Sequence, residues 1–180
     1  QTVTDKNGNA IPWCTYPYIF FIEPRLKKEF KVFEFGCGAS SEWYAQRCGN
    51  VTSVENDKEW YEIVKKKTDK YGNVEILYRE NVKDFLESIF IKREKYDLII
   101  VDCTLKDDSK SREKAMKEAM SACSEKGIIV LDDSERFPIM VNDMIQNGFK
   151  KIDFYGLSPS KGYFGACTTI FYRENNILDI

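Results

Sequence analysis

Two runs of consecutive apolar residues constrain the fold of this chain most strongly: Leu98–Val101 and Ile128–Leu131. A strand that is apolar at every position is buried on both faces, as strands are in a parallel sheet covered by helices. Helical patterns of apolar residues lie between the strand candidates, around residues 60–71, 82–90, 116–123 and 137–145. This alternation predicts an α/β fold with a doubly wound, mostly parallel sheet.

Seven strands are expected in all. The first five are Lys31–Phe35, Val51–Glu55, Val74–Tyr78, Asp97–Asp102 and Ile128–Asp132. Two more, Phe149–Leu157 and Ala166–Arg173, follow Gly148, which we expect to end the last helix. No helical pattern separates these two strands, so they must pair antiparallel. At 180 residues the chain is expected to form a single domain, with an N-terminal cap segment at 1–30 and the core sheet at 31–173.

The first strand runs into Gly36-Cys37-Gly38, and Glu55 follows nineteen residues after Gly36, at the end of the second strand. Glycines in a strand-to-helix turn allow a ligand to approach the backbone closely. An acidic side chain at the tip of the next strand is placed to accept hydrogen bonds from ribose hydroxyls. Together these features predict a binding site for a nucleoside cofactor.

Two details indicate which cofactor binds there. A dinucleotide-binding turn has a third glycine at the position that Ser41 occupies here, and Glu34 precedes the first glycine by two residues. A carboxylate at that position would repel a pyrophosphate but would attract a ligand that carries an ammonium and a sulfonium group. The pattern therefore disfavours a nicotinamide-dependent oxidoreductase.

The segment Glu34–Gly38, with Glu55 after it, resembles the first motif and the ribose-binding acid of class I S-adenosylmethionine-dependent methyltransferases. The resemblance extends over about residues 30–173 and implies the strand order 3-2-1-4-5-7-6, with S-adenosyl-L-methionine as the cofactor. Glu80 and Asn81 correspond in position to an adenine-contacting acid, and the sequence leaves open which of them has that role. The expected cofactor-binding residues are Glu34, Gly36, Cys37, Gly38, Glu55, Asn56, Glu80, Asn81 and Asp102.

The activity implied is methyl transfer to an oxygen or nitrogen of a small-molecule or glycan-like acceptor. The chain contains no histidine, so a general base must be a carboxylate, a lysine or a tyrosine. Each strand end carries polar or acidic residues, and we expect Asp102 or Asp132 to be catalytic.

A metal-dependent version of this chemistry is one alternative. Asp102, Asp132 and Asp133 could together hold Mg²⁺, which prefers oxygen ligands. The segment Leu131–Pro138 is similar to the Asp-Asp segment of metal-dependent sugar and macrolide O-methyltransferases. In the competing interpretation an aspartate, or Ser134, caps a helix that begins at Glu135. We favour the metal-free interpretation, because no histidine is available to strengthen such a site.

Two further alternatives keep the same fold. One is a non-catalytic S-adenosylmethionine-binding or regulatory module, which the small size of the chain and its lack of a cap domain would suit. The other is an aminopropyl transferase, although the N-terminal β domain of that family is missing from this sequence.

The composition and charge of the chain limit the kinds of binding partner that we expect. A net charge of −2 and a pI near 5.4 argue against a general nucleic-acid binder. No apolar run approaches the length of a membrane span. The six cysteines form no Cys-x-x-Cys pair, which indicates reduced thiols and a cytoplasmic protein. A homo-oligomer is compatible with the sequence.

Two segments are candidates for covering the site. Ile11–Tyr18 is rich in aromatic residues and proline, and it either folds over the cofactor or acceptor or packs against the sheet edge. The loop Ser158–Gly165 contains Lys161 and Tyr163, which we expect to point toward an acceptor.

Overall fold

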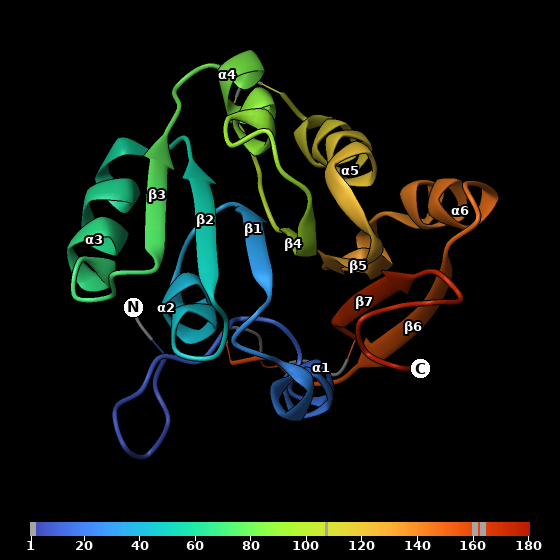
Figure 1. Cartoon of the computed structure of the whole chain (residues 1–180), viewed down its shortest axis with the longest axis horizontal. Helices are drawn as coiled ribbons and strands as arrows, with labels where there is room; N and C mark the ends of the chain where they lie inside the picture. The colour runs from blue at the N-terminus through green and yellow to red at the C-terminus, as the bar shows by residue number, and fades with distance from the viewer. Residues whose placement is uncertain (1–2, 107, 160–161, 163–164) are drawn as a thin grey trace.

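The computed structural model describes residues 3–106, 108–159, 162 and 165–180. Its centre is a seven-stranded sheet with the order β3-β2-β1-β4-β5-β7-β6 (Figure 1). The strands are β1 (Lys31–Phe35), β2 (Asn50–Glu55), β3 (Val74–Tyr78), β4 (Tyr96–Val101), β5 (Cys123–Asp132), β6 (Lys150–Tyr155) and β7 (Cys167–Tyr172). The first five pair in parallel, whereas β7 is antiparallel to both of its neighbours. The expected fold class and strand order are therefore confirmed.

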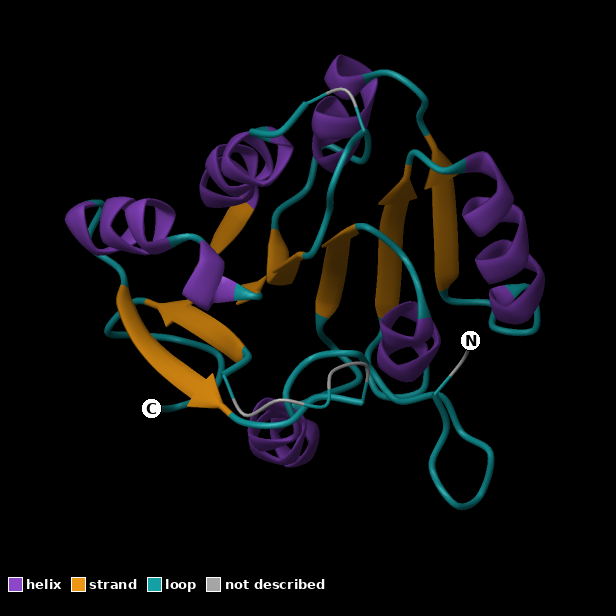
Figure 2. Cartoon of the chain, turned by 180° about the vertical axis from the view of Figure 1, so that it is seen from behind, coloured by secondary structure: helices purple, strands orange, loops and turns teal. Residues whose placement is uncertain are grey.

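Helices lie on both faces of the sheet (Figure 2). They are α1 (Tyr16–Ile22), α2 (Ala39–Ala45), α3 (Lys58–Thr68), α4 (Val82–Glu87), α5 (Ser111–Ala122) and α6 (Pro138–Gln146). Single 3₁₀ turns occur at η1 (Glu23–Arg25), η2 (Ser88–Phe90) and η3 (Ser134–Arg136). Each helix buries an apolar stripe against the sheet, which provides most of its stability.

The central strands contribute alternate residues to two separate cores. Ile99 and Ile129 pack with α4, α5 and α6, while Leu98 and Ile128 pack with α1 and α2. Because successive side chains of a strand point to opposite faces, a strand between two helical layers must be apolar throughout. This requirement explains the unbroken apolar runs in the sequence.

Some boundaries differ from expectation. Strand β5 begins at Cys123, five residues before the expected Ile128, directly after α5 ends at Ala122. The helix expected from Glu135 begins instead at Pro138, after the 3₁₀ turn η3. Proline suits the first turn of a helix and disfavours helical geometry at the residue before it. The expected capping by an aspartate or by Ser134 was wrong: Asp133 makes no side-chain cap hydrogen bond to η3, and the residue before α6 is Phe137. Ser134 lies inside η3, and its hydroxyl donates to the Cys167 oxygen at 3.3 Å.

All six cysteines are free thiols, as expected, and five of them are buried. Within the residues that the structure describes, no helix is both long enough and apolar enough to cross a membrane.

Gly36 is required by the packing of the backbone. Its φ is +96°, and a Cβ atom there would lie 2.3 Å from the main-chain oxygen of Asp102. The N–H of Gly36 donates to the Val54 oxygen at 2.9 Å, and the N–H of Asp102 donates to the Phe35 oxygen at 3.1 Å. The turn after β1 is thus wedged between the ends of β2 and β4, so the glycine serves backbone packing as well as any approach of a ligand.

The substitution Gly36→Ala should destabilise the fold by more than about 2 kcal/mol, because it combines an unfavourable φ with a clash against fixed backbone. Urea unfolding measures this loss. Gly72→Ala is the matched control, since Gly72 has open space around its Cβ position and no positive φ. The control should change stability by less than about 1 kcal/mol. Equal losses in the two variants would contradict the packing argument.

Candidate functional site

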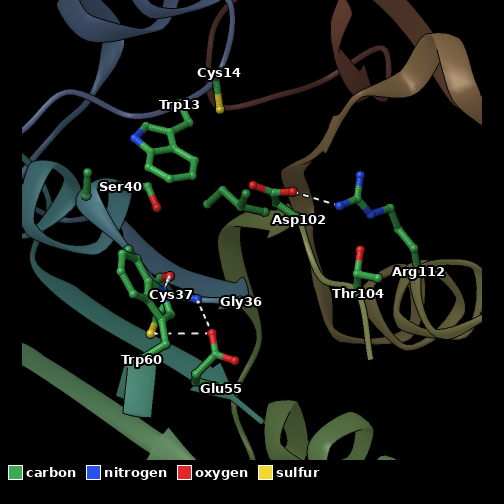
Figure 3. Close-up of a pocket in the computed structure, with 13 residues that line it drawn as sticks. Trp13, Cys14, Gly36, Cys37, Ser40, Glu55, Trp60, Asp102, Thr104 and Arg112 are labelled. Carbon is green, nitrogen blue, oxygen red and sulfur yellow. Dashed lines mark hydrogen bonds and ion pairs between the residues drawn. The ribbon is translucent and has the colours of Figure 1, made fainter. Parts of the chain in front are cut away.

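A cavity of about 420 Å³ lies at the carboxyl ends of β1, β2 and β4 (Figure 3). This is the edge at which open α/β sheets bind their ligands, and the volume is within the range of roughly 300–1,000 Å³ that ligand sites usually have. The cavity is lined by Trp13, Cys14, Gly36, Cys37, Gly38, Ala39, Ser40, Glu55, Trp60, Ile100, Asp102, Thr104 and Arg112. The structure therefore brings together five of the residues expected from the sequence: Gly36, Cys37, Gly38, Glu55 and Asp102.

Glu55 joins two turns at the floor of the cavity. Its Oε1 accepts the N–H groups of Asn56 and Asp57 at 2.8 Å each. Its Oε2 accepts the N–H of Cys37 at 3.3 Å (Figure 3). These bonds fix the orientation of the carboxylate, and each carboxylate oxygen can accept more than one hydrogen bond.

Two tryptophans form an aromatic wall. Trp60, in the first turn of α3, donates from its indole nitrogen to the Cys37 oxygen at 2.7 Å. Its ring lies 6.5 Å from that of Trp13, at an angle of 44°. Trp13 is 40% exposed, whereas Cys14 next to it is buried. The N-terminal segment thus contributes an amphipathic ring at the mouth of the cavity and a buried thiol inside it.

Arg112 forms the opposite side together with Asp102 (Figure 3). Its Nη2 donates to Asp102 Oδ1 at 2.8 Å, its Nε to the Cys103 oxygen at 3.0 Å and its Nη1 to the Asp132 oxygen at 2.9 Å. The guanidinium also lies over the Phe137 ring. The planar fork of arginine suits such a set of acceptors better than a lysine would.

Sequence reasoning missed Arg112. It lies in the first turn of α5 between Lys110 and Lys114, so no local pattern distinguishes it. Only the parallel pairing of β4 and β5, which brings their ends together beside α5, gives it its three acceptors.

Glu34 lies beneath the glycine turn and is not among the residues that line the cavity. It is 1% exposed, and its Oε2 accepts from Ser41 Oγ and Ser53 Oγ at 2.6 Å each. Ser41 Oγ in turn accepts the N–H of Gly38 at 3.2 Å. Oε1 of Glu34 is buried without a hydrogen-bond partner. Burial raises the pKa of this carboxyl above its ordinary value, although the serine hydroxyls act against the shift.

Four other predicted residues do not line the cavity. The backbone N–H of Asn56 donates to the side chain of Glu55, which lines the cavity, and Glu80 is exposed. Asn81 caps α4, with its side chain accepting the Asp84 N–H at 2.8 Å. Asp132 is buried, and its Oδ1 accepts from Thr168 Oγ1 at 2.7 Å. The structure supplies side-chain roles for Asn81 and Asp132 outside the cavity.

The three carboxylates considered for Mg²⁺ have protein partners. Asp102 pairs with Arg112 and Asp133 pairs with Arg136 at 3.4 Å, while Asp132 bonds to Thr168. Over the described ranges, no group of three or more histidine, cysteine, aspartate or glutamate residues is arranged to hold a metal ion. The geometry therefore gives no support to the metal-dependent alternative.

The N-terminal segment both lines the cavity and packs on the sheet edge. Thr15 Oγ1 donates to the Phe154 oxygen at 2.9 Å, and the Tyr16 N–H donates to the Leu157 oxygen at 2.8 Å. The expected packing against the sheet edge is therefore observed, and Trp13 and Cys14 also line the cavity. Lys161 and Tyr163, expected to point toward an acceptor, lie outside the described residues.

Comparison with known proteins identifies the class. Residues 26–167 match the family described as a methyltransferase domain. The chain belongs to this family, and the expected class of S-adenosylmethionine-dependent methyltransferase is confirmed. No curated protein sequence matches the chain.

Similar solved structures cover nearly the whole fold at low sequence identity. An rRNA methylase from Streptococcus thermophilus has a TM-score of 0.64 at 11% identity, covering 87% of this chain and 93% of its own. A precorrin-6y C5,15-methyltransferase from Geobacter metallireducens has a TM-score of 0.65 at 11% identity, covering 97% and 92%. The N-methyltransferase NodS from Bradyrhizobium japonicum, in complex with S-adenosyl-L-homocysteine, has a TM-score of 0.55 at 18% identity, covering 79% and 77%. At these identities the likeness shows the fold and leaves the acceptor open.

The burial of Glu34 predicts how the stability of the fold depends on pH. A carboxyl whose native pKa is raised contributes stability that is fully present below its ordinary value of 4.5 and is lost as the pH rises through the native pKa. In Glu34→Gln this loss should be absent, so the stability of the wild type relative to the variant should fall over that window. Urea unfolding at a series of pH values measures the difference. Glu62→Gln, on the exposed side of α3, controls for the removal of a carboxylate. A difference that does not change with pH would contradict the assignment.

Proposed function

We propose that this chain transfers the methyl group of S-adenosylmethionine to an oxygen or nitrogen of a small-molecule or glycan-like acceptor, without a metal ion. The observation that carries the proposal is the cavity at the strand ends, in which the Gly36–Gly38 turn and the Glu55 carboxylate face an aromatic wall. Neighbours of this fold include a protein solved with the demethylated product, S-adenosyl-L-homocysteine.

The residues present fit such a cofactor in charge. Two carboxylates and one guanidinium line the cavity, and the guanidinium is already paired with Asp102. Glu34, whose Oε1 is buried without a partner, lies beneath the same turn. A ligand with an ammonium and a sulfonium group would find a negative environment in which burial strengthens the attraction.

Individual roles follow from position. Glu55 would accept hydrogen bonds from the two ribose hydroxyls, because its carboxylate is oriented by three backbone N–H groups. The backbone from Gly36 to Gly38 would contact the amino-acid portion of the ligand. Asn56, and either Glu80 or Asn81, would be left for the adenine end, beyond Glu55. Trp13 and Trp60 would exclude water from the bound ligand.

The cofactor supplies an electrophilic methyl group on a sulfonium, so the protein mainly has to position the acceptor and bind its proton. Of the two expected catalytic residues, Asp102 lines the cavity and Asp132 does not. The Asp102 side chain is 44% exposed and has one oxygen paired with Arg112. We therefore assign to Asp102 the role of holding the acceptor hydroxyl or amine and receiving its proton.

The acceptor class is supported by charge. A polyanion such as RNA is bound chiefly through neutralised phosphates, and the net charge of this chain is −2. Besides Glu55, three side chains with hydrogen-bonding oxygens line the cavity, Ser40, Asp102 and Thr104, and they suit a neutral or cationic acceptor with O–H or N–H groups.

Glu55→Ala should weaken the binding of S-adenosylmethionine at least about tenfold, since it removes the acceptors for two ribose hydroxyls. Isothermal titration calorimetry measures this change, and thermal unfolding checks that the variant remains folded. Glu62→Ala, which removes an exposed carboxylate from α3, is the control and should bind like the wild type. If the wild type shows no measurable affinity for S-adenosylmethionine at millimolar concentration, the cofactor assignment is wrong.

Turnover is tested by release of S-adenosylhomocysteine in the presence of pools of hydroxylated small molecules, amines, oligosaccharides and RNA fragments. Release with one of the first three supports the proposal. Release with RNA alone would overturn the acceptor class. Saturable cofactor binding with no release from any pool would favour the non-catalytic binding module.

Metal independence gives a separate prediction. Because arginines pair with Asp102 and Asp133, millimolar Mg²⁺ or excess EDTA should shift the melting temperature by less than about 1 °C. The cofactor affinity should be equally insensitive. A rise in melting temperature with Mg²⁺ that disappears in Asp132→Asn would revive the metal-dependent alternative.

A further inference from the structure

Asp132 is connected to two sides of the cavity although it does not line it. Its main-chain oxygen accepts from Arg112 Nη1 at 2.9 Å, and Arg112 in turn holds the Asp102 carboxylate. Its side-chain Oδ1 accepts from Thr168 Oγ1 at 2.7 Å. The first bond leads to the Asp102–Arg112 side seen in Figure 3, and the second leads to the N-terminal segment.

Thr168 makes the link to that segment. It lies on β7 with no exposed surface, and its Oγ1 also accepts the backbone N–H of Thr15 at 3.0 Å. A hydroxyl has one proton to donate and lone pairs to accept with, so the bonds to Asp132 and to Thr15 are compatible. A directed chain therefore runs from the Thr15 N–H through Thr168 to the Asp132 carboxylate.

Thr15 follows immediately after Trp13 and Cys14, the two residues that the N-terminal segment contributes to the cavity. Its other bonds, to Phe154 and through Tyr16 to Leu157, tie the segment to β6 and the residues after it. The bond to Thr168 is different, because it connects the segment to the end of β5. It is buried, so its loss would leave polar groups without partners in the protein interior.

We propose that Asp132 is a positioning residue, which sets the placement of the Trp13–Cys14 side of the cavity relative to the Asp102–Arg112 side. It acts through Thr168 and Arg112 and does not touch the reacting atoms. The inference rests on the proposed function only for the identity of the ligand that fills the cavity. It also gives a physical reason for an acidic residue at the end of β5 that does not require the residue to be a base.

The test removes the link without removing any residue of the cavity. Thr168→Val keeps the shape of the side chain but can neither donate to Asp132 nor accept from Thr15. Thr168→Ser keeps the hydroxyl and should restore the link. Thr169→Val is the matched control, because Thr169 is equally buried on the same strand but bonds to Ser134 and Asp153.

Reactivity of Cys14 reports the placement of the segment without any ligand. Cys14 is 5% exposed, and alkylation by iodoacetamide can be followed for each cysteine by peptide mass spectrometry. In Thr168→Val the alkylation rate of Cys14 should rise about tenfold, the equivalent of losing one buried hydrogen bond. The rates of Cys48 and Cys103, which are also buried, should stay unchanged and exclude global unfolding. Thr168→Ser and Thr169→Val should resemble the wild type at Cys14.

Affinity for S-adenosylhomocysteine is the second readout, and Thr168→Val should weaken it about tenfold while Thr169→Val leaves it unchanged. A Cys14 rate that is unchanged in Thr168→Val, or equally raised in Thr169→Val, overturns the proposal whatever the ligand is. A raised Cys14 rate in a protein that binds no S-adenosylhomocysteine supports the positioning role and contradicts the proposed function instead.

If Thr168→Val unfolds, every buried thiol will react with iodoacetamide. In that case the same alkylation experiment is done with Asp132→Asn. A neutral amide oxygen is a weaker acceptor than a carboxylate, so a smaller rise confined to Cys14 is expected. A Cys14 rate equal to that of the wild type in Asp132→Asn would then overturn the proposal.

Discussion

The packing of the Gly36 backbone against the Asp102 carbonyl determines where everything else in the site can lie. Strand β1 is flanked by β2 and β4, and backbone hydrogen bonds hold its end to both neighbours. The chain can leave the sheet there only by a turn with positive φ, which glycine adopts at little cost. Once that turn is fixed, α2 begins directly behind it, and the ends of β2 and β4 face each other across the cavity. The glycine motif is therefore first a solution to a packing problem and, as a result, a place where a ligand can approach the backbone.

Two carboxylates hold the N–H groups of this turn by hydrogen bonds. Glu34 beneath it binds Ser41, which receives the Gly38 N–H, while Glu55 beside it binds the Cys37 N–H. Both carboxylates thus orient N–H groups of the turn, one directly and one through a hydroxyl. Such networks are costly to leave partly satisfied. The unpartnered Oε1 of Glu34 is the part of this network that is left unsatisfied, and burial of the same carboxyl raises its pKa.

The sequence predicted the fold well, because the signals involved are local or periodic. Runs such as Ile128–Leu131 need only be apolar throughout to indicate a strand buried on both faces, and the lack of a helix after Gly148 sufficed for the antiparallel pair. The sequence also indicated three residues that line one cavity, since Glu55 ends a strand and Gly36 and Asp102 follow strands directly. What could not be predicted depends on contacts distant in sequence. Thr15 meets Thr168 only because β7 is inserted between β5 and β6, and Arg112 finds its acceptors only because β4 pairs with β5.

The four carboxylates at the carboxyl edge show why position alone does not assign a role. Glu55 is oriented by backbone donors and lines the cavity, and Asp102 lines it with one oxygen held by arginine. Glu34 is buried under the turn, and Asp132 is engaged by Thr168 behind the cavity wall. All four lie within two residues of the carboxyl end of neighbouring parallel strands, and the sequence gives no sign of these differences. The surroundings of the four carboxylates thus differ: Glu55 and Asp102 line the cavity, whereas Glu34 and Asp132 are buried and bonded to hydroxyl groups away from it. The chemistry of this edge therefore depends on which side chains the neighbouring strands and helices bring to each acid.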